Sequence, residues 1–490
     1  MSKGVTPKSE EYSKWYTDTI TKAELADYGP VKGTMVIRPY GYGIWETVQE
    51  AFDKEFKATG HTNAYFPLFI PKSFLSKEAE HVEGFAKECA VVTHSRLKAT
   101  EDGKAVTVDP ESKLEEEIIV RPTSETVIWS MYKKWITSYR DLPILINQWA
   151  NVVRWEMRTR LFLRTSEFLW QEGHTAHATE KEAKEETIKI LNIYKDVLEN
   201  VLAIPVLTGL KSESEKFAGA VETYCIEAMM GDTKALQAGT SHYLGQNFAK
   251  AFDVTFQTED NKEQLVYATS WGVSTRLIGA IIMVHGDDKG LRLPPKVAPT
   301  QVVIIPIMRK NSNPDDIVNY IKIFQNELIE NNIRVYVDMR EKLSPGHKFN
   351  EWEMKGVPIR IEVGPRDIEN GELVVCRRDQ STKETISINN APSHTINLIN
   401  EIQNNLFQQA KQFMDKHTIQ VSTWDEFKTI IKNGGFIKCG WDGTVETENK
   451  IKAETKATIR CIPFDEDPSE LNCIFSGNIA KQQVIFSKAY

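Results

Sequence analysis

Hydrophobic positions in the first half of the chain follow helical and strand spacing in turn. Trp45, Val48 and Phe52 recur with Phe56 on one helical face, which predicts a helix over 46–59. The apolar run 62–71 predicts a strand stopped by proline. We therefore expect helices and strands to be mixed in one large first region.

Further elements of this region follow from the same patterns. The segment 178–202 carries apolar residues on one helical face. The nearly all-apolar run 277–284 predicts a buried helix. We also expect a helix over 78–89 and a charged loop over 100–117 with a turn at Gly103.

The pattern changes after a linker at 286–299 that is rich in glycine and proline. Short apolar strands then alternate with helices, which predicts an α/β region with a mostly parallel sheet. A small last module follows from about residue 420, so we expect three domains, at 1–295, 296–410 and 411–490. The strands of the α/β region are expected at 301–307, 333–337, 359–363 and 372–376, and its helices near 314–331, 347–355 and 393–415.

Composition narrows the class of protein. The 490 residues carry a net charge of −8, so any nucleic-acid contact must depend on local basic patches. The amino terminus lacks the apolar core of a signal peptide, and no apolar run is long enough to cross a bilayer. The six cysteines form no disulfide framework, which fits a reducing cytosol. We therefore expect a cytoplasmic protein that does not bind membranes.

The stretch 147–174 carries the densest candidate chemistry. It predicts two paired strands around a basic turn, and side chains alternate between the faces of a strand. Guanidinium, carboxylate, imidazole and aromatic groups on one face suit a nucleotide. The alternative is a solvated hairpin with ordinary cross-strand ion pairs. The side chains expected to share a face are Arg154 with Glu156, and Phe168 with Trp170, Glu172 and His174.

Three other stretches carry candidate ligands. Thr123 and Glu125 follow the end of an apolar strand, so they either cap the next helix or receive a cationic amine. Small residues around His242 suggest backbone that approaches a ligand closely. Arg276 begins the buried apolar helix and needs a partner, which is either a phosphate or an internal carboxylate.

Together these residues resemble a class II aminoacyl-tRNA synthetase. Three ordered motifs carry the resemblance: a strand around Pro67, Arg154-x-Glu156 followed by Arg164-x-x-x-Phe168, and Gly272-x-x-x-Arg276. From about residue 31 onward the chain resembles prolyl-tRNA synthetases of the archaeal/eukaryotic-like kind. The identifying strings are Arg-Pro-Thr-Ser-Glu-Thr at 121–126, Phe-Leu-Trp-Gln-Glu-Gly-His at 168–174, Gly-Thr-Ser-His at 239–242 and Ser-Pro-Gly-His-Lys-Phe-Asn at 344–350.

The resemblance implies both a fold and a reaction. The fold would be an antiparallel sheet flanked by helices, then an α/β anticodon-binding domain and a small α+β C-terminal domain. Proline and ATP would form prolyl-adenylate and pyrophosphate, and the prolyl group would pass to tRNA(Pro). Mg²⁺ would screen the polyphosphate, and the protein would be a homodimer. Catalysis would rest on positioning and charge neutralisation, with little need for a protein nucleophile.

The resemblance also implies a role for each candidate residue. Arg154 and Arg276 would be the catalytic pair. Glu353, Arg360 and Lys383 would read the paired guanines of the anticodon. The ATP site would comprise Arg154, Glu156, Arg164, Thr165, Phe168, Gln237, Thr240, Ser274 and Arg276. The proline site would comprise Thr123, Glu125, Arg154, Trp170, Glu172, His174, Phe217, His242 and Ser270.

Two features distinguish the chain within the family. The interval from His174 to Gln237 is too short for the editing insertion of bacterial-type relatives. Because one methylene gives only ~1–3 kcal/mol of discrimination, we expect misactivation of alanine or cysteine without editing in cis. The terminal Tyr490 matches relatives whose C-terminal carboxylate reaches back towards the active site.

A third feature concerns metal. Many relatives bind structural zinc with four cysteines in the C-terminal domain. Cys439 and Cys473 match two of these positions, whereas Thr444, Phe475 and Ser476 stand at the others. Two thiolates are too few for a closed zinc site, so we expect structural zinc to be absent and no protein metal site.

Two alternatives stay open. Another class II synthetase, for threonine, glycine or histidine, would share the fold. The amine-binding pair Thr123/Glu125 disfavours threonine, and Trp170 with His174 favours a ring substrate over glycine. A non-catalytic tRNA-binding paralogue would be expected to lose a motif arginine, and all of these arginines are present.

Overall fold

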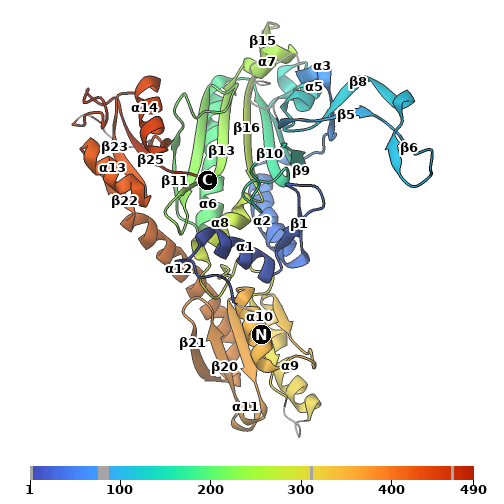
Figure 1. Ribbon diagram of the computed structural model, residues 1–490, viewed down its shortest axis with the longest axis vertical. Coiled ribbons are helices and arrows are strands. Elements are labelled where there is room, and N and C mark those ends of the chain that lie inside the picture. Colours follow the sequence, from blue (N-terminus) through green and yellow to red (C-terminus); the bar gives the residue numbers. More distant parts are fainter. Residues whose placement is uncertain (1–3, 76–87, 309–312, 465–467, 469) are drawn as a thin grey trace.

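The computed structural model describes residues 4–75, 88–308, 313–464, 468 and 470–490. A large sheet with its helices lies in the centre of an elongated molecule (Figure 1). An α/β region lies at one end of the long axis, and a small module lies beside the large sheet. The expected fold class is confirmed, because the large sheet is antiparallel but for one short edge strand.

The large sheet has seven strands. They are β3 (Thr62–Asn63), β9 (Ile144–Val153), β10 (Glu167–His177), β11 (Val206–Leu210), β12 (Glu222–Met229), β13 (Ala235–Gly245) and β16 (Tyr267–Ser274). Their order is β11-β12-β13-β16-β10-β9-β3. The two strands predicted around the basic turn are thus confirmed as β9 and β10, and they lie next to β16 and β13.

Helices cover both faces of this sheet. One face packs against α1 (Tyr12–Lys22), α2 (Pro39–Ala58), α6 (Glu180–Asn200) and α8 (Arg276–His285) in a single core. The predicted face of α2 is buried, although the helix begins earlier than expected, at Pro39, whose fixed φ suits a first turn. Gly173 permits close packing here, since a Cβ atom would lie 2.1 Å from the Trp271 ring. The other face contacts α5 (Glu125–Trp135) and α7 (Asn247–Phe252).

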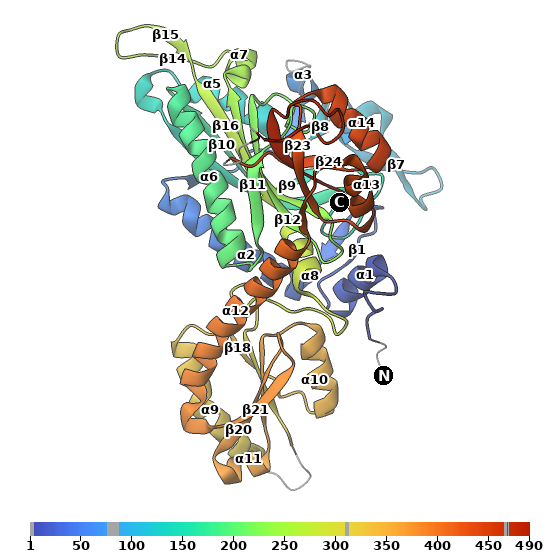
Figure 2. The ribbon, with the colours of Figure 1, turned by 90° about the vertical axis from the view of Figure 1, so that its left-hand side faces the viewer.

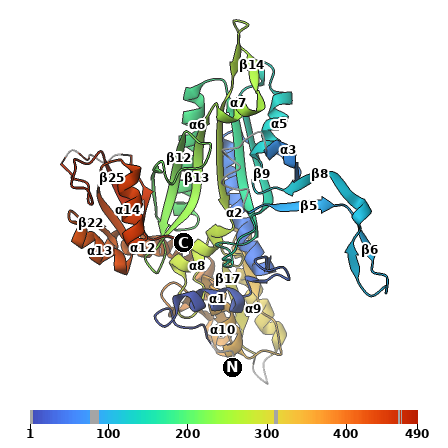
Figure 3. The ribbon, with the colours of Figure 1, turned by 45° about the horizontal axis from the view of Figure 1, so that its top comes forward.

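An arm extends from the large sheet (Figure 3). It is built from β4 (Phe69–Pro71), α3 (Lys72–Leu75), β5 (Ala90–His94), β8 (Lys113–Val120) and the hairpin β6 (Leu97–Ala99) with β7 (Val106–Val108). Smaller hairpins are β1 (Ala26–Tyr28) with β2 (Met35–Ile37), and β14 (Thr255–Gln257) with β15 (Glu263–Leu265).

Two sequence predictions for the arm are wrong. The run 62–71 forms two strands in different sheets, because its prolines cannot donate to a continuous ladder. The charged segment 100–117 is not a loop throughout: the predicted turn at Gly103, with φ +64°, joins β6 to β7, and β8 begins at Lys113. The β-branched run Val106-Thr-Val108 and the Ile118-Ile-Val120 end of β8 favour strands here. The helix expected over 78–89 falls mainly on residues 76–87, outside the described residues.

The α/β region holds a five-stranded sheet. Its strands are β17 (Val302–Pro306), β18 (Val335–Val337), β19 (Ile359–Val363), β20 (Glu372–Arg377) and β21 (Thr382–Ser387), in the order β18-β17-β19-β20-β21. The prediction of a mostly parallel sheet is wrong, since β20 runs antiparallel to both neighbours. Only residues 364–371 separate β19 from β20, which is too short for a parallel crossover. The helices are α9 (Pro314–Glu330), α10 (Pro345–Met354), α11 (Pro365–Asn370) and α12 (Ala391–Lys416).

The long helix α12 leads from the α/β region to the small module (Figure 2). The module contains β22 (Thr418–Gln420), α13 (Trp424–Asn433), β23 (Phe436–Trp441), α14 (Val445–Thr455), β24 (Thr458–Cys461) and β25 (Gln482–Ser487). Its strand order is β22-β23-β25-β24. Among the described residues, no helix combines the length and apolar character needed to cross a bilayer.

Candidate active site

Three neighbouring strands arrange the candidate residues in rows. Opposed residues on paired strands point to the same face of a sheet, and alternate residues of β10 share that face. The prediction that Phe168, Trp170, Glu172 and His174 share a face is confirmed, because all four line one cavity. The rows that the register sets across β10, β16 and β13 are His174–Ser270–His242, Glu172–Gly272–Thr240 and Trp170–Ser274.

The cavity above these rows has a volume of about 220 Å³. Gly272 lies in the middle row, and its missing side chain leaves the backbone there open to a ligand. All the residues predicted to bind proline line this cavity, as do most of those predicted to bind ATP. The predicted residues among its lining are Thr123, Glu125, Arg154, Phe168, Trp170, Glu172, His174, Phe217, Gln237, Thr240, His242, Ser270, Ser274 and Arg276.

Three predicted ATP residues lie outside the cavity lining. Glu156 pairs with Arg164 at 3.2 Å, which is the hairpin ion pair that the alternative interpretation described. The hydroxyl of Thr165 donates to the backbone oxygen of Glu167 at 2.7 Å. Strand β9 ends at Val153, so strand alternation does not place Arg154 and Glu156 on one face. The turn between β9 and β10, and not the alternation of the strands, determines where these side chains lie.

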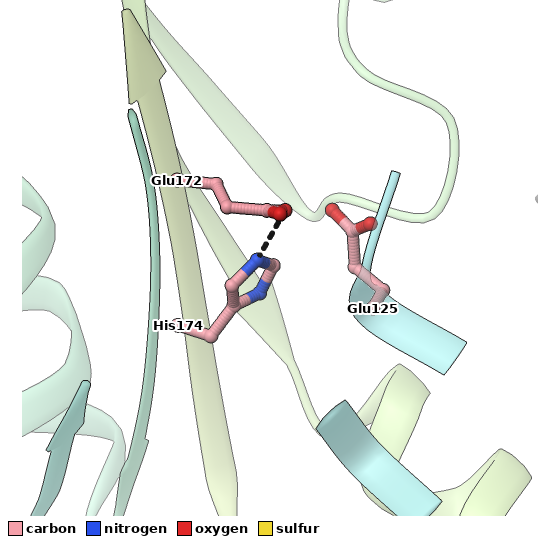
Figure 4. A group of neighbouring side chains, drawn as sticks. All are labelled: Glu125, Glu172 and His174. Atoms are coloured by element: carbon pink, nitrogen blue, oxygen red, sulfur yellow. Dashed lines mark hydrogen bonds and ion pairs between the residues drawn. The ribbon is translucent and has the colours of Figure 1, made fainter. Parts of the chain in front are cut away.

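Two carboxylates and an imidazole lie together at the end of the cavity marked by His174 (Figure 4). His174 Nε2 lies 3.0 Å from a Glu172 oxygen, and Gln148 donates to Glu172 at 2.8 Å. Burial alone would lower the pKa of His174, but the bond to Glu172 and the charge of Glu125 raise it above its usual value. The Glu125 carboxylate faces the same end of the cavity, so a cationic ligand bound there would meet a carboxylate.

Glu125 reaches the cavity from the start of α5. Ser124 occupies the N-cap position of this helix but makes no side-chain cap bond. The hydroxyl of Thr123 donates to the Glu125 carboxylate, and both residues line the cavity. Glu125 thus lies in the first turn of α5 and also lines the cavity, where it and Thr123 fit an acceptor for an amine.

Arg276 lies at the opposite end, at the first residue of α8. Its guanidinium donates to the backbone oxygens of Leu163 and Gln237, both at 3.3 Å. Within the described part of the chain, no carboxylate oxygen lies within 4.0 Å of it. Burial and the nearby charges of Arg154 and Arg164 lower its pKa to about 10. The internal salt bridge is thus not formed, and the helix start remains suited to a phosphate.

Arg154 lies between the two ends. Its Nε donates to the backbone oxygen of Pro122 at 3.0 Å, and its guanidinium lies 5.5 Å from the Phe168 ring and 5.3 Å from the Trp170 ring. The charges of Glu125 and Glu172 partly offset the burial that lowers its pKa. A cation in this position can contact a carboxylate at one side and a phosphate at the other.

Comparison with known proteins gives the family. Residues 107–285 match the tRNA synthetase class II core domain (G, H, P, S and T), and residues 301–397 match an anticodon binding domain. Residues 424–490 match the model for the C-terminal part of prolyl-tRNA synthetase. Proline–tRNA ligases of Azobacteroides pseudotrichonymphae and Porphyromonas gingivalis are each 59% identical over 488 residues, covering 100% of this chain and 99% of theirs. The chain belongs to the prolyl-tRNA synthetase family.

In this prolyl-tRNA synthetase family member, the lining residues that were not predicted as site residues include a carboxylate and a hydroxyl, those of Glu215 and Thr223. Thr223 lies opposite His242 on β12, a strand that hydrophobic patterning did not predict. Its hydroxyl lies 3.0 Å from His242 Nδ1 and accepts a bond from the Phe217 N–H at 3.0 Å. No period in the sequence of β12 marks Thr223 as a site residue.

A second cavity, of about 140 Å³, lies in the α/β region. It brings together the three residues predicted to bind the anticodon, Glu353, Arg360 and Lys383. Arg360 and Lys383 both pair with Glu362, at 2.9 and 2.8 Å. Trp352, Arg377 and Arg378 line the same cavity and were not predicted.

The positions related to zinc ligands lie in the small module. Cys439 and Cys473 are buried on adjoining segments. The nearby carboxylate of Asp442 accepts several hydroxyl bonds, which outweigh its burial and lower its pKa to about 2. The donors are Thr444 at 2.8 Å, Thr447 at 2.9 Å and Ser476 at 2.6 Å.

The terminal residue docks on the large sheet. Tyr490 N–H donates to the Ala235 oxygen at 3.1 Å, and its hydroxyl donates to Asp232 at 2.6 Å. The Arg160 guanidinium lies 5.2 Å from its ring. The end of the chain therefore contacts both the start of β13 and the turn between β9 and β10.

Proposed function

We propose that the chain attaches L-proline to tRNA(Pro) in two ATP-dependent steps through prolyl-adenylate. One observation carries this proposal: a single cavity has carboxylates suited to an amine at one end and, at the other, Arg276, which has no carboxylate partner in the described part of the chain. An amino acid and a polyphosphate would each meet complementary charge there. Membership of the family supports the substrate pair.

Proline would bind over the rows that end at His174. Glu125, with the hydroxyl of Thr123, would accept the secondary ammonium, while Glu172 would hold His174 as its counter-charge. Ser270 lies in the row between His174 and His242 and would form the floor. The walls around the pyrrolidine ring would be Trp170, His174, Phe217 and His242.

ATP would bind towards α8. Arg276 would hold the γ-phosphate, and the adenine would lie between its guanidinium and the Phe168 ring. Gln237, Thr240 and Ser274 would complete the site from β13 and β16. Glu156, Arg164 and Thr165 would join it if the turn between β9 and β10 folds over the nucleotide, with Glu156 bound to the adenine amine.

The first step needs no protein nucleophile. A proline carboxylate oxygen would attack the α-phosphorus, and the bond to the bridging oxygen of the β-phosphate would break to release pyrophosphate. Arg154 would contact both the carboxylate and the α-phosphate, which aligns them and neutralises developing charge. Mg²⁺ would bind the polyphosphate and screen its charge.

We also propose the archaeal/eukaryotic-like type, without an editing insertion. Between β10 and β13 the chain forms only α6, β11, the loop 211–221 and β12, which supports this assignment. Alanine or cysteine would then be activated and not removed. An assay in which this chain alone deacylates Ala-tRNA would contradict the proposal.

Further proposals follow from the family. Glu353, Arg360 and Lys383 would read the anticodon guanines, and their common cavity supports this role. Exposed Tyr65 and Phe69 near β4 support a homodimer contact. The hydroxyl bonds of Asp442 support a module that folds without zinc. The division at 1–295, 296–410 and 411–490 and a cytoplasmic location remain predictions.

The test is amino-acid-dependent ATP–pyrophosphate exchange. Proline is expected to support exchange, with threonine, glycine and histidine inactive and alanine weak. Arg154→Ala should abolish it, since the variant loses contact with both reacting groups. Exchange with another amino acid, or none in a folded chain that binds tRNA, would overturn the proposal.

A further inference from the structure

We propose that the small C-terminal module holds the wall of the proline pocket in place, with Lys452 and Arg460 acting as positioning residues through Glu215. The inference rests on the proposed function for its substrate. It concerns the loop 211–221, which joins β11 to β12. Neither Lys452 nor Arg460 lines the cavity, so both would act only through the loop.

The loop carries the wall of the pocket. The Phe217 ring stacks on His242, with ring centres 4.6 Å apart and planes inclined by 29°. Phe217 and Glu215 both line the cavity. Phe217 reaches the sheet through its N–H bond to Thr223. The position of residues 215–217 therefore sets the shape of the pocket beside His242.

The other side of the loop rests on the module. Leu210 and Ile462 exchange two backbone hydrogen bonds of 2.9 Å. Lys211 Nζ donates to the Arg460 oxygen at 2.9 Å, and the Ser212 hydroxyl donates to Glu448 at 2.8 Å. These bonds fix the first residues of the loop to β24 and α14. Figure 1 shows the module beside the β11 edge of the sheet.

Glu215 connects the loop to the small module two residues before Phe217. Its carboxylate lies 3.1 Å from Lys452 Nζ and 3.8 Å from Arg460 Nη1. Its side chain is 19% exposed, so solvent screens this pair less than a fully exposed one. Because Glu215 also lines the cavity, the pair connects the module directly to the pocket wall. Releasing it should loosen Phe217 while leaving the folded module intact.

Loss of the Glu215–Lys452 pair should affect the binding of proline more than the binding of other substrates. A looser wall should raise the KM for proline without a matching fall in kcat, since Arg154 and Arg276 lie on other elements. Alanine is smaller and would contact Phe217 less, so its KM should change less. The module would thus contribute to selection of proline.

The experiment compares Lys452→Met with Lys450→Met as the matched control. Lys450 lies on the same helix and pairs with Glu446 of that helix, at 2.6 Å. In proline-dependent exchange, Lys452→Met should raise the proline KM about 3- to 5-fold with the ATP KM unchanged, and Lys452→Arg should restore it. Glu215→Gln should raise the proline KM, and adding Lys452→Met to it should raise that KM little further.

A second measurement does not depend on the substrate. Hydrogen–deuterium exchange of the amides in 211–221 should be faster in Lys452→Met than in wild type or Lys450→Met. Unchanged amide exchange, equal effects of the two lysine variants, or additive effects of Glu215→Gln and Lys452→Met would overturn the proposal. If the wild type showed no proline-dependent ATP–pyrophosphate exchange, that result would instead contradict the proposed function. The hydrogen–deuterium exchange would still show whether Lys452 holds the loop 211–221 in place.

Discussion

Charged side chains at the large sheet differ in whether the protein supplies a partner of opposite charge. Glu227 on β12 is fully buried and pairs with Lys211 at 2.7 Å and Arg460 at 3.0 Å. The Arg276 guanidinium instead donates to two backbone oxygens, and among the described residues it has no carboxylate partner. Buried charges that find carboxylates within the protein serve structure, whereas a charge left without one is suited to a ligand. The contrast predicts which variants lose activity and which lose stability.

Arg276→Ala should give the largest effect on activity. Loss of the phosphate contact is expected to lower proline-dependent exchange about 10²–10³-fold, as for removal of one preorganised donor. The melting temperature should not fall, because no carboxylate loses its partner. A large fall in melting temperature would mean that Arg276 is structural and would break the comparison.

Glu227→Gln should give the largest effect on stability. It leaves the buried charges of Lys211 and Arg460 without a carboxylate, which is expected to lower the free energy of unfolding by about 3 kcal/mol. Urea unfolding, followed by tryptophan fluorescence, measures the shift in midpoint. The apolar triple variant Lys211→Met, Glu227→Leu and Arg460→Met should recover stability. Unchanged stability in Glu227→Gln would show that the cluster of Lys211, Glu227 and Arg460 does not stabilise the fold.

The sequence predicted the pocket better than its surroundings, for a physical reason. Phe168, Trp170, Glu172 and His174 lie on one strand, where alternation fixes their common face whatever the rest of the fold does. The buried helix that Arg276 begins and the small residues around His242 indicated further ligand contacts, and the resemblance added a role for each residue. Residues in the turn, such as Glu156, follow no period, so their positions could not be predicted in this way.

Contacts between segments far apart in the chain could also not be predicted from the sequence. Glu215 and Lys452 are 237 residues apart, and their pairing depends on how the small module packs against β11. The same holds for Glu227, because β12 was not predicted as a strand. Periodicity identifies which face of an element is buried but not which element covers it.

Asp442→Asn tests the hydroxyl-bonded carboxylate of the module. The pKa of Asp442 is lowered to about 2 in the folded protein, so its stabilising contribution is present above its ordinary pKa of 3.8 and is lost as pH falls towards 2. The shift corresponds to about 2 kcal/mol at neutral pH. Wild-type stability should fall more steeply than that of Asp442→Asn between pH 4 and 2 in urea unfolding. The exposed Asp425→Asn should behave as wild type, and parallel pH profiles of Asp442→Asn and wild type would contradict the assignment.

Deletion of Tyr490 tests the position of Arg160, whose charge packs, among the described residues, against aromatic rings and not against a carboxylate. Arg160 lies between the rings of Tyr16 and Tyr490, at 4.7 and 5.2 Å, and its backbone bonds to Arg164 close the turn between β9 and β10. Without Tyr490 the turn should loosen, and kcat/KM for proline should fall about 5-fold while the fold remains intact, since a cation–ring contact is worth ~0.5–2 kcal/mol. Tyr490→Phe keeps the ring and should retain most activity. If Tyr490→Phe lost as much activity as the deletion, the hydroxyl bond to Asp232 rather than the ring would hold the turn.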